Sequence, residues 1–168
     1  MSMKLTRDLV TLGAQFRKTV HVQAYDADVD IRPLKTRELA QIVSTLGYTI
    51  DEAMGDLVAA NVSPGSVEAL KNGVVDESVA RMVTRGALSE KFMKYMIEMC
   101  RYGIVDDDVR AAVDDLVGLA AVEIGAAIMS LTFVPQEHLL DFFRAAKDST
   151  GQQSTPQDTG SAVETSTS

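Results

Sequence analysis

Cysteine and aromatic residues are scarce in this sequence. Cys100 is the only cysteine among 168 residues, so no disulfide can form within the chain. Tryptophan is absent and aromatic residues make up 5% of the chain, whereas hydrophobic residues make up 46%. A core must therefore be assembled from aliphatic side chains and methionine, which favours helices packed on one another. The length suits one domain, or one domain with a tail.

Positive charge is also limited. The chain has 16 Lys and Arg against 24 Asp and Glu, giving a formal net charge of −8 at pH 7. Binding to nucleic acid or to an anionic membrane surface requires clustered basic residues, so we expect neither partner. The first 18 residues contain no apolar segment followed by a small-residue cleavage site, so we expect a cytoplasmic protein.

One hydrophobic run, residues 116–134, approaches the length needed to cross a bilayer. Glu123 lies near its middle, where a carboxylate costs roughly 2.5 to 3.5 kcal/mol on insertion scales. Acidic residues precede the run and no basic residue adjoins it. The run therefore predicts a buried core helix and not a membrane span.

Near the N-terminus, two segments alternate between apolar and polar residues. They are residues 19–24 and 28–34, and Asp-containing turn residues separate them. This pattern predicts a β-hairpin over residues 19–32, with Pro33 ending the second strand because proline cannot donate to a ladder.

The rest of the chain up to residue 147 has helical periodicity. Thr36 is positioned to cap the first helix of this body, Gly47 to end it, and Thr49 with Glu52 forms a capping box for the next. Further helices are expected from Pro64 to a stop at Gly73, over residues 76–85, from a cap at Ser89 to a stop at Gly103, and over residues 106–131. A last one from Pro135 carries Leu139, Leu140 and Phe143.

The predicted fold class is α+β and mainly α: a short N-terminal hairpin followed by about six helices. Residues 1–147 are expected to form a single globular domain, with the hairpin at 19–32 and the helical body at 36–147. Residues 148–168 are rich in Ser and Thr and lack aromatic residues, Lys and Arg, so they are predicted to be a disordered polar tail.

No motif for catalysis or metal binding emerges. His21 and His138 lie on different expected elements without ligand-spaced neighbours, and Cys100 falls in an apolar helical stripe, typical of a core residue. The chain has no glycine-rich phosphate loop, nucleophile elbow or zinc pattern. We therefore expect a protein that is not an enzyme and that uses no cofactor and no metal.

Three groups of carboxylates need an interpretation. Asp26, Asp28 and Asp30 loosely resemble a calcium loop, but the glycine and the distal glutamate are missing, so a hairpin turn with a solvated face is favoured. Residues 106–108 are acidic and are expected to cap a helix. Glu123 is the one acid expected to be partly desolvated, paired across the bundle or at a subunit contact.

Methionines are numerous, with 8 in the chain. Filling of the core is the favoured interpretation. The alternative is a deformable groove, because flexible thioethers adapt to varied apolar helices.

The step from hairpin to helix carries a family resemblance. It reads IRPLKTREL, and the residues that carry the likeness are Ile31, Arg32, Pro33, Leu34, Thr36, Glu38 and Leu39. Together with a helical body and a polar tail, this step resembles the tail assembly chaperones of long-tailed bacterial or archaeal viruses. The resemblance covers about residues 18–46 in sequence and the remainder in architecture alone.

The resemblance implies a non-catalytic chaperone. Its partners would be a helical tape-measure-like client, tail-tube subunits and other copies of itself, in the host cytoplasm. We place the client contact on two stripes, and Arg32 would act as a structural anchor that pairs with Glu38. The alternatives are a permanent adaptor or connector of a viral particle and a small helical regulatory subunit. The expected contact residues are Met93, Met96, Met99, Val113, Leu116, Ala120, Ile124, Ile128 and Leu131.

Overall fold

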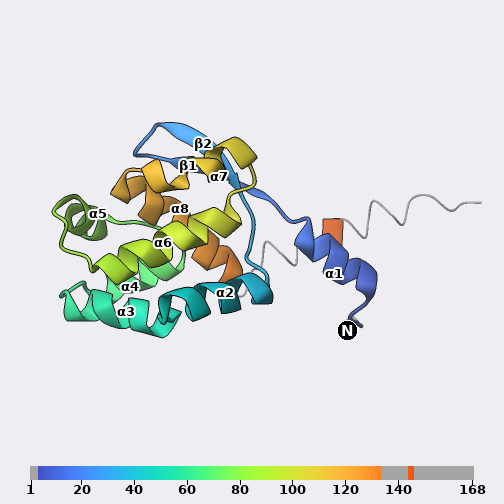
Figure 1. Ribbon diagram of the computed structural model, residues 1–168, viewed down its shortest axis with the longest axis horizontal. Coiled ribbons are helices and arrows are strands. Elements are labelled where there is room, and N and C mark those ends of the chain that lie inside the picture. Colours follow the sequence, from blue (N-terminus) through green and yellow to red (C-terminus); the bar gives the residue numbers. More distant parts are fainter. Residues whose placement is uncertain (1–3, 134–143, 146–168) are drawn as a thin grey trace, which may run out of the picture.

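A two-stranded hairpin and a set of helices surround one central helix, α8 (Gly118–Phe133) (Figure 1). The computed structural model describes residues 4–133 and 144–145. Their elements give an α+β, mainly helical fold with an N-terminal hairpin, as the sequence predicts. A helix that precedes the hairpin, α1 (Arg7–Ala14), stands apart from the other helices (Figure 1).

The hairpin consists of β1 (Lys18–Val22) and β2 (Ala27–Ile31), which pair antiparallel with Val20 opposite Val29. Asp26 makes the turn with a φ of +49°. Alternation places Val22, Val29 and Ile31 in the core and leaves Asp28 and Asp30 exposed. This confirms both the predicted hairpin and the solvated acidic face.

Five helices follow, and the local sequence explains most of their ends. Thr49 and Glu52 form the expected capping box, Ser89 accepts a hydrogen bond from the Phe92 N–H, and Gly47 ends its helix with a φ of +57°. The five helices are α2 (Thr36–Leu46), α3 (Ile50–Ala59), α4 (Pro64–Lys71), α5 (Glu77–Thr84) and α6 (Glu90–Gly103).

The cap of α2 differs from the prediction. Thr36 is the first residue of the helix, not its cap, and Lys35 occupies the capping position. The Glu38 carboxylate accepts a hydrogen bond from the Lys35 backbone N–H at 2.8 Å. Glu38, on the first turn of α2, therefore satisfies the backbone N–H of Lys35. The Lys35 side chain itself has no hydrogen-bond acceptor to offer the helix.

The single helix predicted over residues 106–131 is wrong. The structure has a short helix, α7 (Asp107–Ala111), a 3₁₀ turn (Val113–Asp115) and then α8. Leu116 is extended, and the Val117 N–H donates to the Tyr25 hydroxyl of the hairpin turn at 3.0 Å. A tertiary hydrogen bond thus replaces the intrahelical one, and Gly118 begins the new helix.

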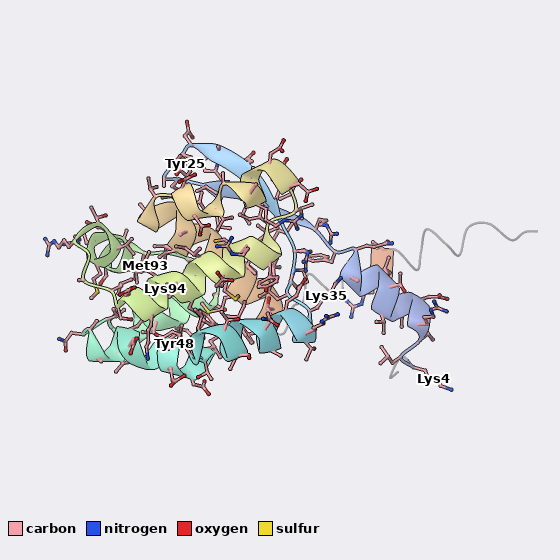
Figure 2. The ribbon with its side chains drawn as sticks, viewed as in Figure 1. Lys4, Tyr25, Lys35, Tyr48, Met93 and Lys94 are labelled. Atoms are coloured by element: carbon pink, nitrogen blue, oxygen red, sulfur yellow. The ribbon has the colours of Figure 1, made fainter. Side chains whose placement is uncertain are left out.

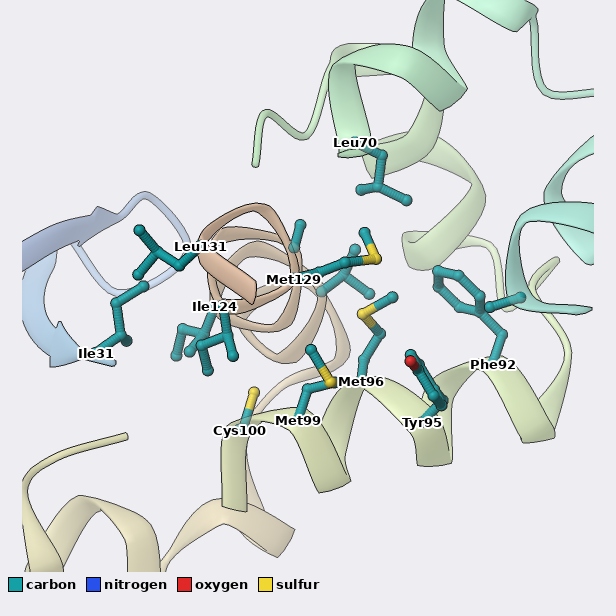
Figure 3. Packing of buried hydrophobic residues seen from close by; sticks show 14 of the residues in the cluster. Ile31, Leu70, Phe92, Tyr95, Met96, Met99, Cys100, Ile124, Met129 and Leu131 are labelled. Atoms are coloured by element: carbon teal, nitrogen blue, oxygen red, sulfur yellow. The ribbon is translucent and has the colours of Figure 1, made fainter. Parts of the chain in front are cut away.

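α8 is buried on almost every side and forms the centre of the core. In Figure 3 it is seen nearly end-on, with Ile31 of the hairpin on one side and the buried side chains of α6 facing it on another. Its most extensive contacts are with α6. Glycines permit the close approach, because a Cβ on Gly103 would overlap the Ile128 side chain and one on Gly125 would lie 2.8 Å from Met96 Sδ.

Some predictions concern segments outside the described residues. They are the polar tail at 148–168 and most of the last helix, including His138, Leu139, Leu140 and Phe143. Among the helices that are described, none combines the length and apolar character that a bilayer crossing requires.

Candidate functional site

The step between β2 and α2 is fixed by an ion pair between Arg32 and Glu38. Arg32 Nη1 and Nη2 donate to the two carboxylate oxygens of Glu38 at 2.8 and 2.7 Å. The two side chains are only 13% and 17% exposed. The pairing expected from the sequence is therefore confirmed, and its bidentate geometry fixes the direction in which α2 leaves the hairpin.

The electrostatic balance at Glu38 favours the ionised form. Burial by itself raises the pKa of the Glu38 carboxyl, but the hydrogen bonds from Arg32 and from the Lys35 N–H outweigh it. The net result is a pKa below the ordinary value. The ion pair therefore persists over the whole neutral range and breaks only in acid.

The other residues of the step anchor it to the core. Ile31 and Leu34 are buried, and Pro33 and Leu39 are half-buried. The Leu34 N–H donates to Thr132 Oγ1 at 3.1 Å, which ties the step to the last turn of α8. The segment that carries the family resemblance is thus a rigid junction between hairpin, α2 and α8.

The residues expected to contact a client lie mostly inside the molecule. On α6, Met96 and Met99 are buried and Met93 is half-buried; Figure 3 shows Met96 and Met99 pointing at α8. Leu116 is also half-buried, and the remaining expected contacts are buried: Val113, Ala120, Ile124, Ile128 and Leu131. The two stripes pack against each other and leave no open groove at these positions.

A hydrogen-bond network that the sequence did not reveal joins the connection between α2 and α3, helix α3 and the N-cap of α6. The Tyr48 hydroxyl and Ser89 Oγ both donate to Asp56 Oδ2, at 2.6 and 2.7 Å. These bonds, the one from Tyr48 first, lower the pKa of Asp56, while burial and then the bond to Asp56 raise the pKa of Tyr48. The Tyr48 ring also packs edge-to-face on Tyr95, with centroids 5.7 Å apart (Figure 2 labels Tyr48).

Cys100 occupies the core position that the sequence suggests, and His21 lies on the exposed face of the hairpin. Cys100 is fully buried and its thiol donates to the Ala121 carbonyl, and burial raises its pKa to about 12. A thiol with that pKa stays protonated, which suits a core residue. His21 is exposed on β1, with Nδ1 2.8 Å from Asp28 and Nε2 3.3 Å from Asp26.

The hairpin and α8 border a cleft of about 220 Å³, with residues 72–75 on its other side. Gly73 lets this connection approach α8 closely, because a Cβ there would lie 3.2 Å from the Ser130 Cβ. Glu123, half-buried in the cleft, accepts a hydrogen bond from the Ala24 N–H at 3.2 Å. Glu123, which the sequence predicts to be partly desolvated, therefore binds the backbone just beyond the end of β1.

The described residues contain no cluster of three or more His, Cys, Asp or Glu side chains arranged to hold a metal ion. Asp106 instead caps α7, accepting from the N–H groups of Asp108 and Val109. Comparison of the chain with known protein families, curated proteins and solved structures finds no match. The protein is therefore classified by its fold alone. It is an α+β protein, mainly helical, in which a β-hairpin precedes most of the helices.

Proposed function

We propose that the chain is a non-catalytic tail assembly chaperone that holds a helical, tape-measure-like client in solution until tail-tube subunits assemble around it. The resemblance at residues 31–39 supports this class. The observation that carries the proposal is the exposed apolar surface of α1 and of the residue that leads into it. Leu5, just before the N-cap of α1, and Val10 on the helix are 76% and 58% exposed, and no residue of α1 is buried.

An exposed apolar helix is suited to a helical client. Leu9 and Leu12 lie three positions apart on one side of α1 and are only half-buried, and the exposed Leu5 precedes the helix. Apolar residues at this spacing lie along the apolar face of another helix, as in other helix-binding proteins. The client contact is thus assigned to α1, because the methionine stripe and α8 are occupied within the core.

Co-expression tests this assignment. The parent chain is produced together with a tape-measure-like helical protein, and the soluble fraction of that client is measured. We expect the client to stay soluble with the parent chain and to precipitate with the variant Leu5→Ser/Val10→Ser. The matched control is Val43→Ser/Val58→Ser, which removes exposed valines from α2 and α3.

Two outcomes would contradict the proposal. A client that precipitates with the parent chain rules out the holding activity, and a control variant that fails like the α1 variant rules out the role of α1. Purified particles separate the chaperone from an adaptor subunit. A chaperone is absent from finished particles, whereas an adaptor is present at fixed stoichiometry.

A further inference from the structure

The two edges of the hairpin differ in how they are covered. The outer edge of β2 is occupied, because the Arg32 N–H donates to the Gly103 carbonyl and the Val105 N–H donates to the Asp30 carbonyl. An isolated bridge between Ile31 and Ile104 completes this contact. Within the described residues, the backbone of β1 bonds only to β2 and to the turn that follows.

The open edge of β1 has the properties of a pairing site. It contains no proline, and its register with β2 is regular, without a bulge. An uncovered strand edge presents unpaired N–H and C=O groups that another strand can satisfy. The edge also borders the cleft between β1, residues 72–75 and α8, so there is open space beside it.

Two charges of opposite sign flank this edge. Lys18 begins β1, lines the cleft and forms no ion pair with a described residue. Glu123 lies at the other end, because its Oε2 accepts from the Ala24 N–H just beyond β1. Among the described residues, its second oxygen, Oε1, has no hydrogen-bond partner. One end of the edge thus offers a cation and the other a carboxylate oxygen.

We propose that two copies of the chain pair antiparallel through β1 and form a four-stranded sheet. If the two-fold axis passes through Val20, Lys18 of one copy lies opposite Val22 of the other. Lys18, Val20 and Val22 share the face of the strand that turns toward α8. Lys18 of each copy therefore reaches the Glu123 carboxylate of the other, and the symmetric pair makes this contact twice.

The arrangement of charges identifies a second copy as the occupant. An antiparallel partner strand must carry a cation at its first residue and small apolar residues on the same face to match this edge. The sequence of β1, KTVHV, meets that pattern itself. The interface is self-complementary and independent of the client that α1 is proposed to hold.

Sedimentation velocity with charge-reversal variants tests the pairing. The parent chain is expected to be a dimer at micromolar concentration, and Lys18→Glu to raise the dissociation constant by roughly tenfold or more, because like charges then meet. Lys18→Glu/Glu123→Lys restores opposite charges and is expected to restore the dimer. The matched control, Lys91→Glu, reverses an exposed charge on α6 and leaves the dimer intact.

A parent chain that stays monomeric overturns the proposal. It is also overturned if Lys18→Glu dimerises as the parent does, if the double variant fails to recover while circular dichroism shows a native fold, or if Lys91→Glu weakens the dimer equally.

A disulfide test reports on the axis itself and requires no charge reversal. With the axis at Val20, the variant Val20→Cys places two thiols on directly opposite residues, within the range that a disulfide spans. Treatment with oxidised glutathione is expected to give a covalent dimer on a non-reducing gel. Ala27→Cys, an exposed position on β2, is the control and should stay monomeric. Equal cross-linking of both variants, or of neither, contradicts this register.

Discussion

Two ion pairs with similar distances differ in their surroundings, and so in their effect on the fold. Arg32 and Glu38 are joined at 2.7 Å with side chains 13% and 17% exposed, whereas Arg81 and Glu77 are joined at 3.0 Å with side chains 62% and 84% exposed. An exposed ion pair adds little stability, because water solvates the separated charges almost as well. Removing one partner of a shielded pair leaves the other charge unpaired and poorly solvated, which is destabilising. The first pair also connects two elements, and the second lies within one helix.

Arg32→Ala is expected to lower the free energy of unfolding by about 2 kcal/mol, because Glu38 then loses two charge-assisted hydrogen bonds while half-buried. Arg81→Ala serves as the control and is expected to change it by less than about 0.5 kcal/mol. Urea denaturation followed by circular dichroism measures both. Equal losses in the two variants would show that the shielding of Arg32 has no energetic effect.

His21 allows a second prediction at the level of one side chain. The hydrogen bond to Asp28, with smaller contributions from the charges of Asp28 and Asp26, raises the pKa of His21 above 6.5. Protonated His21 is therefore more stable in the folded hairpin than in the unfolded chain. This stabilisation is complete below pH 6.5 and disappears as the pH rises through the raised pKa.

NMR titration of the His21 ring protons is expected to give a pKa above 6.5 in the parent chain. Asp28→Asn removes the charge and is expected to return the pKa toward 6.5, whereas Asp30→Asn, which leaves the acids beside His21 in place, should change it little. An unchanged titration in Asp28→Asn would contradict the assigned cause.

At the level of elements, glycines decide how closely two helices pack. A Cβ added to Gly103 of α6 would lie within 2.7 Å of three atoms of Ile128. A Cβ added to Gly55 of α3 would have no neighbouring atom within 4 Å. Both glycines lie in helices, so alanine improves the local helix propensity at each. Only at Gly103 does the added methyl group meet a packed side chain.

Gly103→Ala is expected to destabilise the protein by about 1 to 3 kcal/mol through overpacking against α8. Gly55→Ala is expected to stabilise it by up to about 1 kcal/mol. Thermal unfolding measures both effects, and Gly103→Ala/Ile128→Val is expected to recover part of the loss. If Gly103→Ala is as stable as the parent, the packing of α6 on α8 has room for an added methyl group, which contradicts the prediction.

Several elements could be predicted because their signals are local. The hairpin follows from alternation, and the starts of α3 and α6 follow from capping residues one turn from the groups they bind. The break between α7 and α8 could not be predicted in this way. It depends on Tyr25, which is 92 positions away from Val117 in the sequence. Helical periodicity across residues 112–117 carries no trace of that hydrogen bond.

For the whole molecule, the sequence identified apolar stripes but not what covers them. A stripe on α6 has the same pattern whether it faces a client or another helix of the same chain. In this chain the α6 stripe faces another helix, because α8 is apolar on all sides and buries the stripes of its neighbours. Arg32 and Glu38 were predictable as a pair, since a cation and an acid flank a helix start. The network of Tyr48, Asp56 and Ser89 brings three separate segments of the chain together and has no local signature.

The acid stability of the molecule follows from several carboxylates with lowered pKa values. They include Glu38, Asp56, Asp76 and Glu90, whose ordinary values are 4.5 for Glu and 3.8 for Asp. The unfolded chain binds protons at a higher pH than the folded chain does at these groups. Their stabilisation is therefore complete above the ordinary values and disappears as the pH falls through the lowered ones.

Apart from the gain that His21 contributes as the pH falls through its raised pKa, the free energy of unfolding is thus expected to be nearly constant from neutral pH down to about 5. It is expected to fall steeply below about pH 4. Glu38→Gln lowers stability at neutral pH and removes one titrating group, so its curve should be shallower and approach the parent curve in acid. The control, Glu68→Gln, changes an exposed glutamate of α4 without an ion-pair partner among the described residues and should follow the parent. Urea denaturation at a series of pH values measures all three curves. If the free energy of unfolding of Glu38→Gln falls as steeply in acid as that of the parent, folding does not lower the pKa of Glu38.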